Sequence, residues 1–394
     1  MKGILKNMSE KIKKTNWVST FKLTGKARIN DNSFKINEVS QSGWCYNNLN
    51  LGVDCGEKFG NVYANLMGGY STNNDNVIYV HGKKDDGSDD FENRFTIDWK
   101  NRNDDEVLDD IGDFCFIKIG LETTEGGKIY TQRFLSAYDA VAYVNEHLTN
   151  DTVITVQGTM KYSFYKDGVS LQRNITSIFL SKAEPENYKA VFSQSILIDK
   201  ESINLKEDID KDRSSLKIHA RVLDYVKEIN GTEFKGQYPM PYTFEYEYAS
   251  EDMLKKIYDK LFKVKKGVRQ INFEGEFVNS GAVVQATMED VPDDVKLLIE
   301  MGLYTEEEIL TKYAAQGNTE RRCILTKPIV RIEGDEENKK AVIQMFDERY
   351  TEDELEIQIE NSKSDSESSI DFATLDDDDD DMAWLNELGL GEDE

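Results

Sequence analysis

Aromatic side chains alternate with polar and basic ones in the first part of the chain. Trp44, Tyr46 and Asn48 share one face of a strand predicted over residues 43–48. A nucleobase can stack on any exposed ring for about 1–3 kcal/mol, while lysine and arginine beside the ring bind the phosphates. This combination is typical of a surface for single-stranded nucleic acid. The candidate binding residues are Lys22, Lys26, Arg28, Trp44, Tyr46, Tyr63, Lys118, Tyr130, Arg133, Lys161 and Arg173.

The same rings have a structural interpretation. Aromatic residues are common in the core of twisted sheets, so each ring is also a candidate core residue. Exposure of Trp44, Tyr46 and Tyr63 beside Lys26 and Arg28 would favour a binding site, and burial would favour a core.

Motifs for other chemistry are missing from the sequence. It contains no Walker phosphate loop, no GxSxG, no HExxH and no GxGxxG after a strand. The four cysteines have neither CxxC spacing nor a histidine at ligand spacing. We therefore predict no catalytic residue, no metal site and no cofactor. The enzymatic alternative is a metal-dependent nuclease that uses acidic pairs such as Asp104 and Asp105, although 75 acidic residues produce such pairs by chance.

Net charge is divided unevenly along the chain. The 394 residues include 75 Asp and Glu against 48 Lys and Arg, which gives a formal charge of −27. Residues 351–394 hold 18 acidic residues and one lysine, a net charge of −17 that leaves −10 for the first 350 residues. Residues 1–28 carry +7 and residues 255–269 carry +6. This segregation is compatible with a local basic binding surface in an acidic protein.

Composition argues against several classes of protein. An acidic chain with four cysteines and no glycine period is unlike a basic duplex-binding protein, a collagen-like fibre or a disulfide-stapled secreted domain. No apolar run reaches the roughly 18 residues of a membrane span. The apolar run after Met1 is too short for a signal peptide. We expect a cytoplasmic protein, in the host cytoplasm if the chain is viral.

Alternation of apolar and basic residues predicts a repeated strand. One copy has apolar residues on one face from Phe21 to Ile29 and basic residues on the other, and a second copy runs from Leu216 to Val222, displaced by 195 positions if Lys22 matches Lys217. Each copy is followed by further strands and then by an amphipathic helix. Ser136 and Asp139 predict the start of the first helix, and Ser250 predicts the start of the second, which we expect to stop at Gly267.

A closing pair of strands follows each helix. Gly158 in the first pair and Gly275 in the second mark sharp bends, displaced by 117 positions. The partner strands end at residues 178–180 and 283–286. Three strands, a helix and two strands are the order of an oligonucleotide/oligosaccharide-binding (OB) barrel. We predict an α+β fold, mainly β, with tandem OB barrels of which the first is enlarged.

The remaining segments complete the predicted organisation. Helices are expected over residues 292–301, 305–315 and 336–349. The acidic end has too little apolar content to fold, so we expect it to be disordered. The predicted domains are a basic arm at 1–16, an enlarged OB module at 17–184, a second OB module at 185–291, a helical segment at 292–350 and a disordered acidic tail at 351–394.

A basic arm, barrels with interleaved aromatic residues and a polyaspartate tail tipped by apolar residues together resemble a bacteriophage-type single-stranded DNA-binding protein. The resemblance implies that the chain coats single strands in DNA replication, recombination and repair, with self-association on DNA. It also implies that the tail recruits polymerase, helicase or primase and competes with DNA for the groove. The tail residues concerned are Asp376, Asp377, Asp378, Asp379, Asp380, Asp381, Trp384, Leu385 and Leu388.

The leading hypothesis is thus a non-enzymatic protein that binds single-stranded DNA. The alternative is a structural or assembly component, for instance associated with a virion, whose barrels bind protein. A tail that serves only solubility is the alternative interpretation of the acidic segment, and the apolar tip with Trp384 favours recruitment over it.

Overall fold

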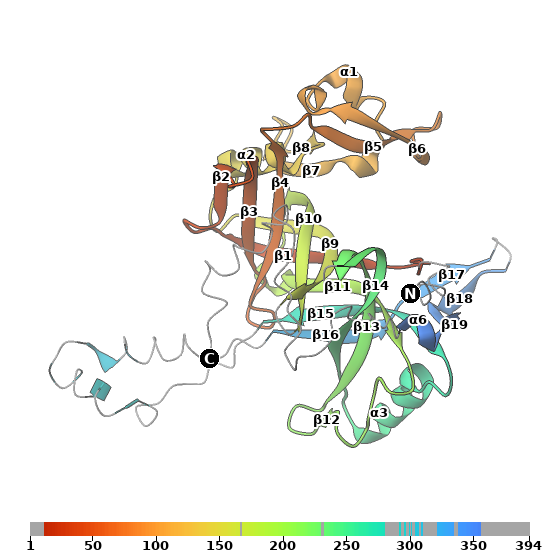
Figure 1. Cartoon of the computed structure of the whole chain (residues 1–394). Helices are drawn as coiled ribbons and strands as arrows, with labels where there is room; N and C mark the ends of the chain where they lie inside the picture. Colours follow the sequence, from red (N-terminus) through yellow and green to blue (C-terminus); the bar gives the residue numbers. More distant parts are fainter. Residues whose placement is uncertain are drawn as a thin grey trace, which may run out of the picture.

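The structure, a computed structural model, describes residues 12–165, 168–229, 232–279, 321–334 and 338–355, with isolated positions between 291 and 309. Strands dominate this part of the chain, and its helices are few and short (Figure 1). The predicted α+β class with OB-like barrels is confirmed. Residues 1–11 of the predicted arm and residues 356–394 of the predicted tail, with all its docking residues, lie outside the described part.

Five strands close the first barrel. The strand β1 pairs with β3 and β9, β3 pairs with β4, β4 runs parallel to β10, and β10 pairs back with β9. The helix α2 lies in the chain between β4 and β9, as in an OB barrel. The elements are β1 (Ser19–Arg28), β2 (Phe34–Val39, beside β3), β3 (Trp44–Asp54), β4 (Asn61–Ser71), α2 (Ala137–His147), β9 (Val153–Tyr165) and β10 (Gly168–Leu180).

A second barrel closes in the same order. The strand β11 pairs with β13 and β15, β13 pairs with β14, β14 runs parallel to β16, and β16 pairs with β15. The elements are η4 (Pro185–Asn187), β11 (Lys189–Ile198), β12 (Ile209–Asp210), β13 (Ser215–Ile229), β14 (Thr232–Glu247), α3 (Glu251–Ile257), the π-helical turn η5 (Tyr258–Phe262), β15 (Val268–Val278) and β16 (Arg322–Pro328).

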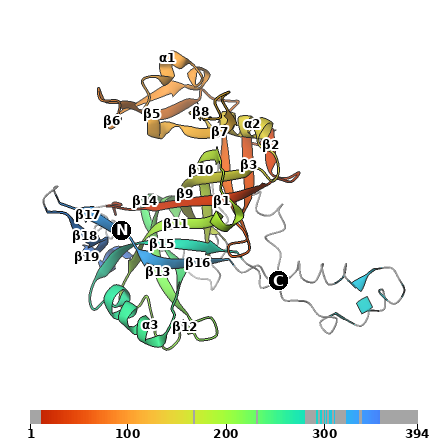
Figure 2. The ribbon, with the colours of Figure 1, turned by 180° about the vertical axis from the view of Figure 1, so that it is seen from behind.

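The two barrels are joined through their first strands. β1 and β11 pair antiparallel, with Phe21 opposite Phe192, and lie side by side in Figure 2. Within the described residues, this pairing joins the barrels into one 15-stranded sheet. Each phenylalanine also lies opposite a glycine of its own barrel, Gly158 in β9 and Gly275 in β15. A Cβ on Gly275 would lie 2.2 Å from the Phe192 ring, so the close approach requires glycine there.

The repeat predicted from the sequence is real, but its alignment is wrong. Residues 216–222 lie in β13, the second strand of their barrel, whereas β1 corresponds to β11. Alternation of apolar and polar residues is typical of any half-buried barrel strand, so it does not show whether a segment is the first or the second strand of its barrel. The enlargement of the first barrel consists of residues 72–136, between β4 and α2, where the second barrel has only residues 248–250.

This insertion, residues 72–136, adds a small layer beside the first barrel (Figure 1). Its strands β5 and β6 form a separate hairpin, whereas β7 joins the barrel sheet parallel to β10. A core of its own includes Val80, Ile97, Ile111 and Phe116. The elements are β5 (Val77–Lys83), β6 (Asp89–Asp98), η2 (Trp99–Asn101), α1 (Asp105–Leu108), η3 (Asp113–Cys115), β7 (Ile117–Thr123) and β8 (Ile129–Phe134).

Two predicted helices are confirmed, and one is wrong. The Ser136 hydroxyl accepts a hydrogen bond from the Tyr138 N–H at the start of α2, and Ser250 accepts one from Met253 at the start of α3. The second helix ends at Phe262, before Gly267. Residues 336–349 contain strands instead of a helix, because this segment extends the sheet at β15 and forms a ribbon. The strands are β17 (Val330–Glu333), β18 (Lys340–Ile343) and β19 (Met345–Tyr350).

Several other predicted segments lie wholly or partly outside the described residues. The closing strand over 283–286 is among them, and the second edge of β15 is occupied by β16 and β19. Positions 295, 296, 299, 306 and 309 are helical, within the helices expected after residue 292.

Both ends of the described chain pack against the second barrel. Ile12 is buried beside Tyr350, whose hydroxyl donates to the Lys13 carbonyl at 2.9 Å. The predicted arm is therefore anchored from residue 12. The predicted tail begins with an ordered turn, α6 (Glu352–Leu355), whose Leu355 is buried. No helix among the described residues is long and apolar enough to span a membrane.

Candidate nucleic-acid interface

Three of the predicted cationic residues lie in one row across the first barrel. Lys22 of β1 lies opposite Gln157 of β9, and Gln157 lies opposite Ser177 of β10. On the other side of β10, Ser177 lies opposite Lys118 of β7, and Lys118 lies opposite Arg133 of β8. Directly paired residues project to the same side of a sheet. We call Lys22, Lys118 and Arg133 the basic row.

The basic row faces away from the barrel core. A chain neighbour of the row residue on each of four strands is fully buried, and successive side chains of a strand point to opposite faces. These buried neighbours are Leu23, Val156, Ile178 and Ile119. The row therefore lies on the outer face, where it spans four strand spacings, or roughly 19 Å.

A pocket of about 600 Å³ lies over the middle of the basic row. Phe114 and Phe116 from the insertion, together with Phe179 from β10, supply aromatic lining, and Lys22 and Lys118 also line it. Phe114 is 76 % exposed, whereas Phe116 is buried. An exposed ring above cations is the arrangement that favours stacking of a base and binding of its phosphates.

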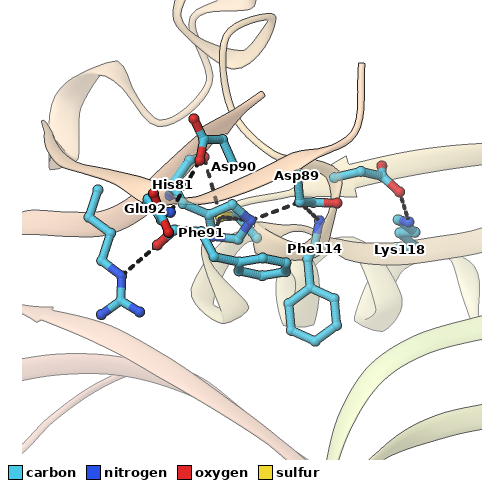
Figure 3. A network of polar contacts seen from close by, with 10 residues as sticks. His81, Asp89, Asp90, Phe91, Glu92, Phe114 and Lys118 are labelled. Carbon is cyan, nitrogen blue, oxygen red and sulfur yellow. Dashed lines mark hydrogen bonds and ion pairs between the residues drawn. The ribbon is translucent and has the colours of Figure 1, made fainter. Parts of the chain in front are cut away.

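Phe114 is held in place by a chain of polar contacts within the insertion (Figure 3). Its backbone N–H donates to Asp89 Oδ1 at 2.9 Å, and the same oxygen lies 2.7 Å from His81 Nε2. His81 Nδ1 lies 3.2 Å from Cys115 Sγ. The Phe91 ring packs edge-on against Phe114 at a centroid distance of 5.9 Å.

The chain of Cys115, His81 and Asp89 has the order of residues found in thiol enzymes, but its electrostatics favour a structural role. Burial raises the pKa of the Cys115 thiol, whereas an activated thiol has a lowered pKa. The Phe114 N–H and His81 hold the pKa of Asp89 below its usual value, so this carboxylate stays ionised as an acceptor. Within the described residues, no group of three or more His, Cys, Asp or Glu side chains is arranged to hold a metal ion.

Two cations of the row have nearby partners. Lys118 forms an ion pair with Asp113, with the two side chains 33 % and 52 % exposed. The Arg133 guanidinium lies over the Phe116 ring, 4.7 Å from its centroid. Exposed ion pairs contribute little to stability, so a phosphate can replace Asp113 beside Lys118 at small cost.

Arg28 and Tyr63 form a second group. Both lie opposite Gly52, and both line a pocket of about 480 Å³. Tyr63 is 40 % exposed, as a stacking residue would be. Arg28, however, donates to Asp54 at 2.6 Å and to Asp151, so two carboxylates already compensate its charge.

Trp44 and Tyr46 are not beside these cations. Their rings are half-buried and stack on each other, with centroids 5.1 Å apart and planes 13° apart. Trp44 is eight positions along β3 from Gly52, which faces Arg28, a separation of roughly 26 Å. The pair therefore lies at the other end of the strand.

Four further candidates do not join the basic row. Arg173 stacks over the Phe277 ring at 4.0 Å from its centroid, at the junction of the barrels, where desolvation lowers its pKa. Lys26 lies opposite Asp54. Lys161 is exposed on β9, four positions beyond Gln157 on the outer face. Tyr130 is exposed on β8, where it neighbours Tyr143 of α2.

The outer face turns acidic where the second barrel begins. The row continues from Lys22 through Val191 to Glu276 of β15, and Glu274 lies two positions away. Glu276 pairs with Lys58 at 2.5 Å, and Glu274 pairs with Lys327 at 3.0 Å. The basic row is thus not continued by a cation on β15.

Sequence reasoning missed Phe114, Gln157, Ser177 and the residues that hold Phe114. Phe114 lies between Asp113 and Cys115, in a segment without strand alternation that would have marked an exposed ring. Gln157 and Ser177 acquire a role only through the register of β9 with β10. No local signal in the sequence identifies them.

The fold defines a protein built of two OB barrels in tandem, with an insertion in the first. No family model matches the chain, and no curated protein matches it. Among solved structures, it is similar to a crystal structure of a deletion mutant of the single-stranded DNA binding protein from Thermus aquaticus, with 10 % sequence identity over 67 % of this chain and 87 % of that chain. The TM-score of 0.28 is too low to support an argument about function.

Proposed function

We propose that this chain binds single-stranded DNA without strong sequence preference and without catalysis. The observation that carries the proposal is the basic row beneath an exposed Phe114 on the outer face of an OB barrel. Cations in a row bind successive phosphates of a flexible strand, and an exposed ring stacks on any base. On β15 the same row presents Glu276 in place of a cation, which favours the first barrel as the binding half.

The test is a titration of a labelled single-stranded oligonucleotide at several salt concentrations. Compared with the wild type, the variant Lys22→Gln/Lys118→Gln/Arg133→Gln should bind more weakly. The slope of log K against log [salt] should become shallower by about 0.7 for each phosphate that the row no longer binds. The control is Lys58→Gln/Lys327→Gln, which removes two cations outside the row that pair with Glu276 and Glu274.

The control variant should retain the wild-type slope. The proposal is wrong if the wild-type protein does not bind single strands, or if the row variant and the wild type have equal slopes. Incubation with Mg²⁺ should leave the DNA intact, and cleavage would favour the nuclease alternative.

The finer role follows from the sequence. We propose that the chain is a phage-type single-stranded DNA-binding protein that acts in the cytoplasm, in DNA replication, recombination and repair. The six carboxylates from Asp376 to Asp381 compete with DNA for the basic row, while Trp384, Leu385 and Leu388 dock a polymerase, helicase or primase. In the same titration, a chain that ends at Leu375 should therefore bind DNA more tightly than the full chain.

A second candidate function is contact with protein, as in an assembly component. The observation that favours it is the β17 and β18 ribbon, where Val330 is 52 % and Ile332 is 66 % exposed. Exposed apolar residues on a ribbon are typical of contact surfaces. A stable assembly by light scattering, without affinity for single strands, would favour this function over DNA binding.

A further inference from the structure

We propose that the pocket beneath Phe114 takes one unpaired nucleobase of the bound strand, with Phe114 stacked on it. The proposal rests on the function proposed above and names what this part of the surface recognises. The pocket, of about 600 Å³, lies between the insertion and the strands β1, β9, β10 and β11. Its size is within the range of pockets that bind small organic groups.

The lining suits a flat, partly polar ring. Phe114, Phe116 and Phe179 supply aromatic surface, and the Gln157 amide and the Thr159 and Thr176 hydroxyls supply polar groups. Amide and hydroxyl groups can act as donor or acceptor, so they can serve the edges of different bases. The pocket therefore favours a base as a chemical class rather than one particular base.

The charged residues at the pocket favour a base that is part of a phosphate-linked strand. Lys22 of β1 and Lys118 of β7 both line the pocket on opposite sides of β9 and β10, so phosphates can bind on either side of the inserted base. Asp113 lines the pocket too and pairs with Lys118, where a phosphate can replace it. A base in a duplex would have to leave its stack and its pair to enter, which costs a few kcal/mol. A single strand does not incur the pairing cost, so the pocket favours single strands.

Asp89 acts as a positioning residue for the stacking ring. Asp89 Oδ1 accepts a hydrogen bond from the Phe114 N–H and also contacts His81 of the neighbouring strand β5, which fixes the position of the carboxylate (Figure 3). An added Cβ at Gly112 would lie 2.5 Å from both Asp89 Oδ1 and the His81 ring, so the turn before Phe114 packs directly on this pair. A ring held in advance loses less entropy on stacking.

The experiment uses the full chain and a single-stranded oligonucleotide with one 2-aminopurine, whose emission reports stacking. Phe114→Leu should weaken binding by up to about 5- to 150-fold, the equivalent of one base stack, and should reduce the emission change on binding. Its salt slope should stay that of the wild type, because no cation is removed. Phe114 is 76 % exposed, so the substitution leaves the core intact.

A matched control is Tyr79→Leu, since Tyr79 is 83 % exposed on the same insertion but does not line the pocket. It should retain wild-type affinity and emission. Asp89→Ala should reproduce part of the Phe114→Leu loss, whereas Asp89→Asn keeps an acceptor oxygen for the Phe114 N–H and should lose less. Both Asp89 variants remove the same charge, so the difference between their affinities reports the effect of the hydrogen bond that positions Phe114.

The outcomes separate this inference from the proposed function. If the wild type binds single strands with a salt-dependent affinity but Phe114→Leu binds equally well, the pocket proposal is overturned and the proposed function stands. The same holds if Tyr79→Leu loses as much as Phe114→Leu. If the wild type does not bind single strands at all, the proposed function fails, and this inference fails with it.

Discussion

Gly158 is a position where one added side-chain atom would disturb the packing of the first barrel. A Cβ there would lie 1.9 Å from the Asn174 carbonyl oxygen and 2.8 Å from the Phe21 ring. The first of these neighbours is backbone of the adjacent strand, so it cannot rotate away. We expect Gly158→Ala to lower the free energy of unfolding by roughly 1–3 kcal/mol, measured by chemical denaturation.

Gly126 provides the control for this substitution. An added Cβ there would have only the Thr124 hydroxyl within 4 Å, at 3.9 Å. Gly126→Ala should change the free energy of unfolding by less than about 1 kcal/mol. Equal losses in the two variants would contradict the close packing of β9 on β10.

At the residue scale, the sequence predicts which side of a strand is buried better than it predicts which residues become neighbours. Alternation correctly placed Phe21, Leu23 and Ala27 inside. The basic row depends on register as well, and the ladder of β9 and β10 shifts between Ile175 and Ser177. That irregularity brings Ser177 opposite both Gln157 and Lys118, and no sequence pattern announces it.

Among the elements, α2 shows how a short helix closes a barrel. Its residues Val141 and Val144 are fully buried in the main core. Ser136 satisfies an N–H of the first turn with its hydroxyl and is itself buried. Because Ser136→Ala leaves that N–H without its partner, the free energy of unfolding should fall by about 1 kcal/mol, measured by denaturant titration.

Ser88 is the comparison for this change. Its hydroxyl also makes a local hydrogen bond, to Asp86, but in an exposed turn. Ser88→Ala should alter the free energy of unfolding by less than about 0.5 kcal/mol. If Ser136→Ala were equally mild, the cap would not contribute to the stability of α2.

Helices that begin at a capping residue could be predicted from the sequence. Strands that form only by pairing with a segment far away in the chain could not. The helices capped by Ser136 and Ser250 form where their caps predict them. The segment 336–349 has a composition that also suits a helix, yet β19 pairs with β15 through Met345 and Phe346. An available sheet edge outweighs weak helix propensity, and the sequence does not show that edge.

At the scale of the whole molecule, burial of acidic hydroxyl and thiol groups sets the response to alkaline pH. Burial raises the pKa of Cys55 to about 12, and it raises the pKa values of Cys323, Tyr162 and Tyr242. Well below the unfolded thiol pKa of about 8.5 the thiols are neutral in both states, so their contribution to stability is fully present. Above it the unfolded chain ionises first, so the folded state loses stability as pH rises toward 12.

The measurement is the free energy of unfolding between pH 8 and pH 10.5. Each group that ionises only in the unfolded chain should contribute a loss of up to about 1.4 kcal/mol per pH unit. Cys55→Ala should lower stability at pH 8 because it leaves a cavity, but its pH dependence should be shallower than that of the wild type. Parallel curves for the two proteins would show that Cys55 does not contribute to this linkage.

The tandem organisation was predictable from the recurrence of strand, helix and bent strand, whereas the assembly of the two barrels was not. Gly158 and Gly275 carry the periodic signal. The pairing of β1 with β11, and the location of the insertion between β4 and α2, depend on contacts between segments far apart in the chain. The candidate site depends on such long-range contacts. The sequence therefore predicts its cations by residue type, but not their alignment in one row.

The pairing of Phe21 with Phe192 has a consequence for behaviour at low concentration. Two barrels on separate chains would part on dilution, since their association would follow mass action. Here both belong to one polypeptide, so their contact is intramolecular and its extent is independent of the protein concentration. The shared sheet persists at any dilution at which the chain stays folded.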